Sequence, residues 1–141
     1  MNDEPDRFVL DACALIAYFH DEVGAERLEQ LLDQAHLDEI ELYVASVNAY
    51  EVFYDALRRT GSERANELLA DVYSLPLSVV ETIDQVLIQL AGRFKVTYRM
   101  SLADSLALAL AGRLNARLVT TDHHEFDVVE AAGAASFYWL R

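Results

Sequence analysis

Phe8-Val9-Leu10-Asp11 opens the stretch that decides the fold of this chain, and Ala12-Cys13-Ala14-Leu15-Ile16 completes it. Three large apolar residues without polar alternation predict a strand that is buried on both faces, and the small apolar residues that follow predict a helix that begins at once. Asp11 therefore stands at the carboxyl end of a buried strand. In an open α/β sheet this edge is where ligands bind, although the N-cap of the next helix is an equally good explanation for Asp11.

Short apolar runs alternate with helical patterns along the rest of the chain. Strands are expected over residues 8–10, 41–45, 77–80, 117–120 and 135–139. Helices are expected directly after Asp11 and over residues 25–35, 46–59, 63–73, 82–94, 101–112 and 122–132. The residues of the 82–94 helix expected to face inward are Ile83, Val86, Leu87 and Leu90. Repeated strand–helix units predict an α/β fold with a central parallel sheet of four to five strands and helices on both faces.

The size and composition of the chain predict a single domain over residues 1–141. The sequence is 53% hydrophobic with five Gly and two Pro, which excludes a disordered or fibrous chain. No apolar run approaches the length of a membrane span. Residues 1–6 are acidic where a secretory signal would be basic, and the single cysteine, Cys13, has no partner for an internal disulfide. We therefore expect a cytoplasmic protein that does not bind membranes.

The net charge of −13 argues against an anionic partner such as nucleic acid. The charges are unevenly spread, however, because 12 of the 24 acidic residues fall within the first 41 positions, whereas eight of the 11 basic residues lie between Arg58 and Arg117. Part of the surface is therefore expected to be locally positive. Arginine suits bidentate pairing with phosphate, and a solvated helix face is the alternative explanation for such residues.

Four acidic residues are expected at one edge of the sheet. Asp11 and Asp122 each follow a predicted strand, and Asp104 opens the helix that leads to the strand before Asp122. Glu51 lies early in the 46–59 helix but too deep to be its cap. Helix capping explains the three aspartates one by one, and a solvated helix face is the alternative for Glu51.

Carboxylates that lie close together raise one another's pKa unless cations neutralise them. Oxygen ligands without Cys or closely spaced His suit hard ions such as Mg²⁺ or Mn²⁺, which clamp phosphates during two-metal hydrolysis of phosphodiesters. The four acids therefore predict metal-dependent chemistry on phosphate.

Four motifs around these acids resemble those of the PIN-domain ribonucleases, and in particular those of the VapC-like toxins of toxin–antitoxin pairs. In chain order they are Leu10-Asp11-Ala12-Cys13-Ala14-Leu15-Ile16, Ser46-Val47-Asn48-Ala49-Tyr50-Glu51-Val52, Ser101-Leu102-Ala103-Asp104-Ser105-Leu106-Ala107-Leu108-Ala109 and Leu118-Val119-Thr120-Thr121-Asp122. The resemblance implies a three-layer PIN-like fold and a metal-dependent endoribonuclease with an antitoxin partner. The residues it implies as catalytic and metal-binding acids are Asp11, Glu51, Asp104 and Asp122, with Asn48 and Thr120 as supporting polar residues. The uneven charge distribution makes Arg93 and Arg99 candidates for RNA contacts.

Two positions depart from the family pattern. Ala12 stands where many members carry Ser or Thr, so that a hydrogen bond near Asp11 is expected to be missing. After Asp122 the chain is one residue longer before Phe126 than is usual. The motif therefore leaves open whether Glu125 or Asp127 lines the site.

Two other functions compete with the nuclease. A catalytically silent module would keep the fold as a binding scaffold, and only an activity assay separates it from an enzyme. A phosphatase that uses Asp11 as nucleophile would also need Mg²⁺, but it would want a second acid where Cys13 stands. A receiver-type phosphoacceptor would want a lysine near the carboxyl end of the sheet, whereas Lys95 follows a predicted helix.

The helix that carries Glu51 is more apolar than one sheet face requires. The apolar residues on its two sides are Val47, Tyr50, Tyr54 and Leu57, and Phe53 and Ala56. Part of this surface is therefore expected to be buried against a second chain, either in a homodimer or against an antitoxin.

Overall fold

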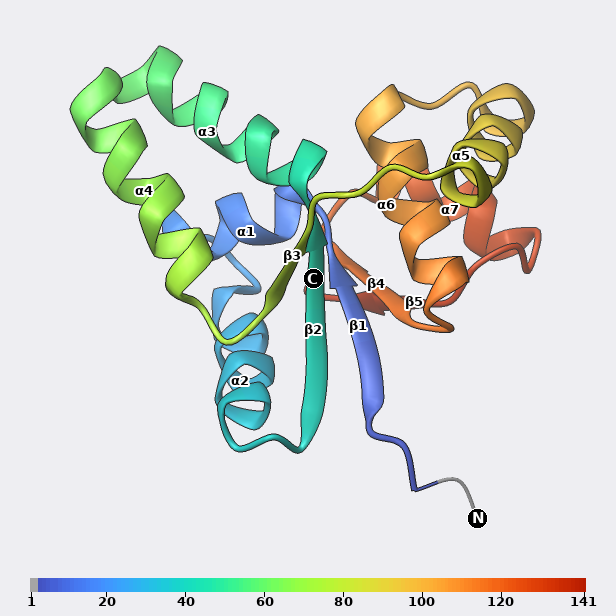
Figure 1. Cartoon of the computed structure of the whole chain (residues 1–141), viewed down its shortest axis with the longest axis horizontal. Helices are drawn as coiled ribbons and strands as arrows, with labels where there is room; N and C mark the ends of the chain where they lie inside the picture. Colours follow the sequence, from blue (N-terminus) through green and yellow to red (C-terminus); the bar gives the residue numbers. More distant parts are fainter. Residues whose placement is uncertain (1–2) are drawn as a thin grey trace.

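The computed structural model describes residues 3–141, so that Met1 and Asn2 of the acidic amino terminus lie outside the described residues. Over this range the chain forms five strands and seven helices (Figure 1). The strands are β1 (Asp6–Leu10), β2 (Ile40–Ala45), β3 (Ser78–Val80), β4 (Arg117–Thr120) and β5 (Phe137–Trp139). The helices are α1 (Ala12–Phe19), α2 (Ala25–His36), α3 (Ser46–Thr60), α4 (Ser62–Ser74), α5 (Gln85–Tyr98), α6 (Leu102–Arg113) and α7 (His123–Ala131).

All five strands are parallel, and their order in the sheet is β3-β2-β1-β4-β5. This confirms the predicted α/β fold with a parallel sheet. The chain runs outward from β1 to β2 and β3, and then returns to place β4 on the other side of β1. The strand order therefore reverses between β1 and β4, and α/β sheets bind ligands outside the carboxyl ends of the strands at such a point.

Helices cover both faces of the sheet, as predicted (Figure 1). On one face, Phe8 and Leu10 of β1 pack with apolar residues of α1, α2, α3 and α4. On the other face, Val9 packs with residues of α5, α6 and α7. None of these three side chains is more than 3% exposed, because successive residues of a strand point to opposite faces. The apolar run over residues 8–10 therefore forms the centre of a three-layer fold.

Helix α6 is buried against the sheet, which it contacts at β1, β2 and β4. Every residue from Ser105 to Ala111 is buried, as expected for a helix that is apolar on all sides. This packing fixes the position of Asp104 in the first turn of α6. Within residues 3–141, no helix has both the length and the apolarity needed to cross a membrane.

Helix α5 begins later than the predicted 82–94 range, because the Asp84 side chain caps it by accepting a hydrogen bond from the Leu87 N–H at 3.0 Å. Ile83 lies before the helix and Val86 lies on its outer side, so that their side chains are 48% and 53% exposed. The prediction that these two residues face inward is therefore wrong, whereas Leu87 is buried as expected.

Candidate active site

Asp11 directly follows the central strand and is only 1% exposed. Its backbone N–H donates to the Val119 carbonyl at 3.2 Å, which joins the ends of β1 and β4. Its side chain accepts a hydrogen bond from the Ala14 N–H at 2.8 Å, so that Asp11 does cap α1. The other carboxylate oxygen accepts a hydrogen bond from the Thr120 hydroxyl, a contact that helix capping does not require.

The environment of Asp11 disfavours its charged form. Burial raises the pKa of Asp11 to about 7, the hydrogen bonds from Thr120 and Ala14 offset part of this effect, and the negative charges of Asp104 and Asp122 raise the pKa further. Asp11 therefore changes its charge near neutral pH, which is unusual for an aspartate. A buried group with so perturbed a pKa at a strand-order reversal is a candidate for function.

Thr120 also holds the backbone at the end of β4. Its hydroxyl oxygen accepts a hydrogen bond from the Asp122 N–H at 3.0 Å while the hydroxyl donates to Asp11. Asp122 in turn accepts a hydrogen bond from the Glu125 N–H at 3.1 Å and caps α7. One buried threonine therefore links the two aspartates at the point where the strand order reverses.

Glu51 lies on α3 and is half-buried, not fully solvated. Burial raises its pKa, and the hydrogen bond from Asn48 offsets part of this rise. The Asn48 side-chain amide donates to Glu51 at 3.3 Å and to the Ala103 carbonyl at 3.5 Å. Because Ala103 immediately precedes Asp104, Asn48 links α3 to the first turn of α6 and sets Glu51 relative to Asp104.

Asp104 is the acid that interacts with the largest number of other carboxylates. Burial raises its pKa to about 6, a hydrogen bond with Ser101 offsets part of the rise, and the charges of Glu51, Asp122 and Glu125 raise it further. The structure thus places Asp104 within electrostatic reach of acids from α3 and α7, as well as of Asp11.

The sequence left open which acid after Asp122 faces the others. Glu125 is half-buried, and its charge acts on Asp104. Asp127 is instead exposed, and its Oδ1 lies 2.8 Å from Nδ1 of His123. The spacing of a helix cap, which puts Glu125 in the first turn of α7, is the signal that could have found it.

The sequence profile of the PIN domain matches residues 8–132. The chain belongs to the PIN-domain family. This confirms the resemblance drawn from the four motifs. A search of curated proteins gave no match for the sequence.

Solved structures of low sequence identity share this PIN fold. The DNA-bound VapBC complex of Salmonella typhimurium contains a chain with a TM-score of 0.73 at 16% identity, covering 96% of this chain and 99% of that one. VapBC2 of Rickettsia felis, bound to a DNA fragment from its promoter, gives a TM-score of 0.72 at 15% identity, with coverage of 94% and 98%. VapC20 of Mycobacterium tuberculosis, a toxin that cleaves the sarcin–ricin loop, gives a TM-score of 0.65 at 16% identity, with coverage of 91% and 95%. The structural neighbours of this PIN domain are thus VapC toxins.

The donor groups of the site fit a hard cation. They are carboxylate oxygens, which Mg²⁺ and Mn²⁺ prefer, and a cation would stabilise the charged forms of Asp11, Glu51 and Asp104, whose pKa values burial raises. Among the residues that the structure describes, the buried Asn48 Oδ1 has no hydrogen-bond partner, and the waters that Mg²⁺ keeps bound are donors for such an oxygen. As the side chains stand, no three His, Cys, Asp or Glu residues in the described range 3–141 lie close enough to share one ion. Binding therefore requires rotation of the carboxylates toward one another.

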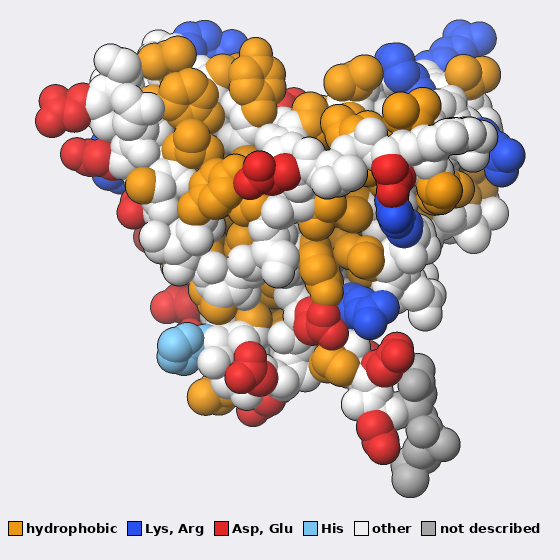
Figure 2. Space-filling model, viewed as in Figure 1, with side chains coloured by type: hydrophobic (Ala, Val, Ile, Leu, Met, Phe, Trp, Pro, Cys, Tyr) orange, Lys and Arg blue, Asp and Glu red, His pale blue; other side chains and the backbone are white. Residues whose placement is uncertain are grey.

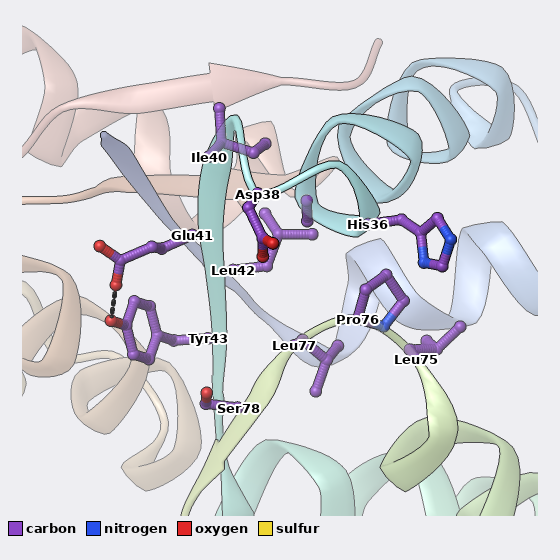
Figure 3. Close-up of a pocket in the computed structure, with 11 residues that line it drawn as sticks. His36, Asp38, Ile40, Glu41, Leu42, Tyr43, Leu75, Pro76, Leu77 and Ser78 are labelled. Carbon is purple, nitrogen blue, oxygen red and sulfur yellow. Dashed lines mark hydrogen bonds between the residues drawn. The ribbon is translucent and has the colours of Figure 1, made fainter. Parts of the chain in front are cut away.

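The pocket in Figure 3 lies elsewhere in the fold. It has a volume of about 380 Å³ and is lined by the end of α2, the first residues of β2 and the segment that enters β3. The Tyr43 hydroxyl donates a hydrogen bond to Glu41 at its side. None of the four acids lines this pocket, so that its position at the beginning of the strands separates it from the candidate active site.

Proposed function

We propose that this PIN-domain protein is a metal-dependent endoribonuclease that hydrolyses phosphodiester bonds of RNA as the toxin of a toxin–antitoxin pair. The observation that carries the proposal is the gathering of Asp11, Glu51, Asp104 and Asp122 at the carboxyl edge of the sheet, where burial raises the pKa of three of them. Such an arrangement is costly for the metal-free protein, which is typical of a functional site. The VapC fold of the structural neighbours supports the same activity.

The four acids would hold Mg²⁺ or Mn²⁺, which when bound activates water and stabilises charge on the transferring phosphoryl group. The protein contributes the positions of the ligands. Thr120 and the Ala14 N–H hold the two Asp11 oxygens in fixed directions. Asn48 orients Glu51 through its side-chain amide and fixes the distance between α3 and α6. These hydrogen bonds are the kind of outer contact that tunes ligand geometry at metal sites.

Helix α3 offers a surface for a protein partner. Tyr50 is 62% exposed, and Tyr54 and Leu57 are 39% and 40% exposed. The Tyr50 and Tyr54 rings contact each other with centroids 5.2 Å apart, and Figure 2 shows hydrophobic side chains gathered over this part of the molecule. We propose that this surface is buried in a homodimer or against an antitoxin, since several structural neighbours were solved as toxin–antitoxin complexes.

The competing phosphatase receives no support from the site. A phosphatase that used Asp11 as nucleophile would want a second acid at position 13, where Cys13 stands, and burial together with the nearby carboxylates raises the pKa of its thiol to about 12. The Cys13 thiol is therefore protonated at neutral pH and is not a nucleophile.

Cleavage of labelled RNA by the purified protein in Mg²⁺ and Mn²⁺ tests the proposal. We expect Asp104→Asn and Glu51→Gln to abolish cleavage, because each removes one anionic ligand. Asp127→Asn is the matched control, since Asp127 is an exposed acid that pairs with His123. A wild type that binds its partner protein but cleaves no RNA with either metal would instead support the silent binding module.

A further inference from the structure

Among residues 3–141, the Lys and Arg side chains without an acidic or aromatic partner lie at one helix end. Seven of the 10 arginines make ion pairs with acids: Arg7, Arg58, Arg59, Arg64, Arg113, Arg117 and Arg141. Arg27 lies over the Tyr138 ring at 4.6 Å. Over residues 3–141 this leaves Arg93, Arg99 and the single lysine, Lys95, without an acidic or aromatic partner, and all three lie at the carboxyl end of α5 or at its cap.

The stretch of sequence around this helix end is also poor in acidic residues. Residues 85–121 contain one acid, Asp104, although the chain has 24 acids in 141 residues. This segment comprises α5 and α6, which pack against each other. Figure 2 shows Lys and Arg side chains at the upper right of the molecule, over this part of the fold.

Helix capping explains only part of the basic cluster. The Lys95 ammonium group donates to the Met100 carbonyl at 3.0 Å and so stabilises the end of α5. The Arg93 and Arg99 side chains are exposed, and neither has such a contact among the hydrogen bonds and ion pairs of the described residues. Their guanidinium groups are free to bind an external anion.

The outer side of α5 is open to a partner. Its ridge runs through Gln85, Gln89, Gly92 and Val96 at helical spacing, all exposed, with Val96 82% exposed. Arg93 flanks this ridge. A side chain added at Gly92 would meet no atom within 4 Å. The ridge thus combines uncharged positions, among them the apolar Val96, with a flanking cation.

The basic end of α5 adjoins the candidate active site. Arg99 is the C-cap of α5, and Ser101 caps α6 two residues later by accepting a hydrogen bond from the Asp104 N–H at 3.1 Å. Five residues of chain span at most about 18 Å, so that Arg99 and the catalytic carboxylate are within a few nucleotides of each other.

We propose that the exposed side of α5, from Gln89 to Arg99, binds the sugar–phosphate backbone of the RNA that flanks the cleaved bond. This inference rests on the nuclease function proposed above. Charge complementarity selects RNA, because these cations are the unpaired positive charges of a protein at −13 and they lie beside the acids proposed to cleave phosphodiesters. In this arrangement the Arg guanidinium groups bind phosphates of the RNA, and the uncharged ridge lets the RNA backbone approach the helix closely.

The test measures binding of a short fluorescein-labelled single-stranded RNA by fluorescence anisotropy. Ca²⁺ replaces Mg²⁺ in every sample, because its looser coordination should support binding without turnover, so that the RNA stays intact. We expect Gly92→Glu to weaken the affinity about tenfold, because it places a negative charge on the ridge. The substitution causes no clash and replaces a glycine within a helix, which protects the fold. Gly112→Glu is the matched control, since Gly112 also has open space around it and lies near the far end of α6.

The salt dependence of RNA affinity in a second variant measures the number of phosphate contacts. Replacing Arg93 and Arg99 together by Ala should reduce the slope of log affinity against log salt by about 1.4, since each phosphate contact with a single strand contributes about 0.7. Unchanged affinity and slope in these variants would overturn the inference even if the wild type cleaves RNA. Unchanged RNA binding with a loss of oligomerisation in sedimentation would overturn it in favour of a protein partner. Binding that depends on α5 in a wild type without nuclease activity would support the inference and refute the proposed function.

Discussion

Replacing Asp11 by Asn should stabilise the metal-free protein at neutral and alkaline pH. Asp11 ionises with a pKa near 3.8 in the unfolded chain and about 7 in the folded protein. Below pH 4 both states are protonated, and the buried carboxyl carries no penalty. As the pH rises toward 7, the unfolded state loses its proton first, so that folding becomes less favourable by about 1.4 kcal/mol for each unit of pH.

The full effect is bounded by the difference of about three pKa units, which corresponds to about 4 kcal/mol above pH 7. Asn does not titrate, so that Asp11→Asn removes this penalty. Asn also caps helices as well as Asp does, and it can keep the hydrogen bond from the Ala14 N–H. The stability gained by the variant should therefore be small near pH 4 and grow to a plateau above pH 7.

Urea unfolding in chelator at pH 5 and pH 8 measures the gain. Asp84→Asn is the matched control, because Asp84 also caps a helix but has a lowered pKa, owing first to the hydrogen bond from the Leu87 N–H and then to that from Arg113. A carboxyl group whose pKa is lower in the folded protein than in the unfolded chain stabilises the fold at pH values above its unfolded pKa. The Asp84→Asn control should therefore be less stable than the wild type at pH 8. An Asp11→Asn variant that is less stable than the wild type at pH 8, or whose gain does not change with pH, would refute the reasoning and leave Asp11 as a structural cap.

Asn48→Leu removes both hydrogen bonds donated by the Asn48 amide and should weaken Mn²⁺ binding 10- to 100-fold in calorimetry, as roughly expected for an outer contact of a metal site. An unchanged affinity would show that Glu51 needs no such support. RNA binding should nearly vanish in chelator and return with Mg²⁺ or Mn²⁺, and Ca²⁺ should restore binding without turnover because its coordination is looser; cleavage in chelator would exclude a metal-bridged complex. Tyr50→Glu should shift the protein to a lighter species in sedimentation, whereas the control Tyr73→Glu, exposed on α4, should not. Arg27→Ala should leave RNA affinity close to that of the wild type, because Arg27 is engaged with a ring on the far side of the sheet from α5.

The sequence was sufficient for the fold because its strands are short apolar runs that each end at a recognisable turn or cap. Phe8 to Leu10 are buried on both faces, as their lack of alternation predicted. The error at α5 has a local cause. Ile83 and Val86 fit the helical spacing of Leu87 in the sequence. Because Asp84 caps the helix, however, Ile83 lies outside it, and the buried side of the helix contains Leu87 but not Val86.

The site was harder to derive, because its key contacts join distant segments. For Asp11 the sequence leaves helix capping and ligand binding as alternatives, whereas in the structure one carboxylate oxygen accepts from the Ala14 N–H and the other from the Thr120 hydroxyl. A contact over so long a sequence distance leaves no periodic signal. Glu125 was less hidden, because the cap spacing from Asp122 places it in the first turn of α7, where its charge acts on Asp104.

The most direct test of the central claim is whether one cation binds between the acids at the carboxyl edge of the sheet. A crystal of the protein soaked in Mn²⁺ should show an anomalous peak bounded by the carboxylates of Asp11, Asp104 and Asp122, with Glu51 turned toward it. The peak should disappear in a crystal of Asp104→Asn prepared in the same way. A Mn²⁺ peak only at surface acids outside this edge, or one that persists in Asp104→Asn, would contradict the account.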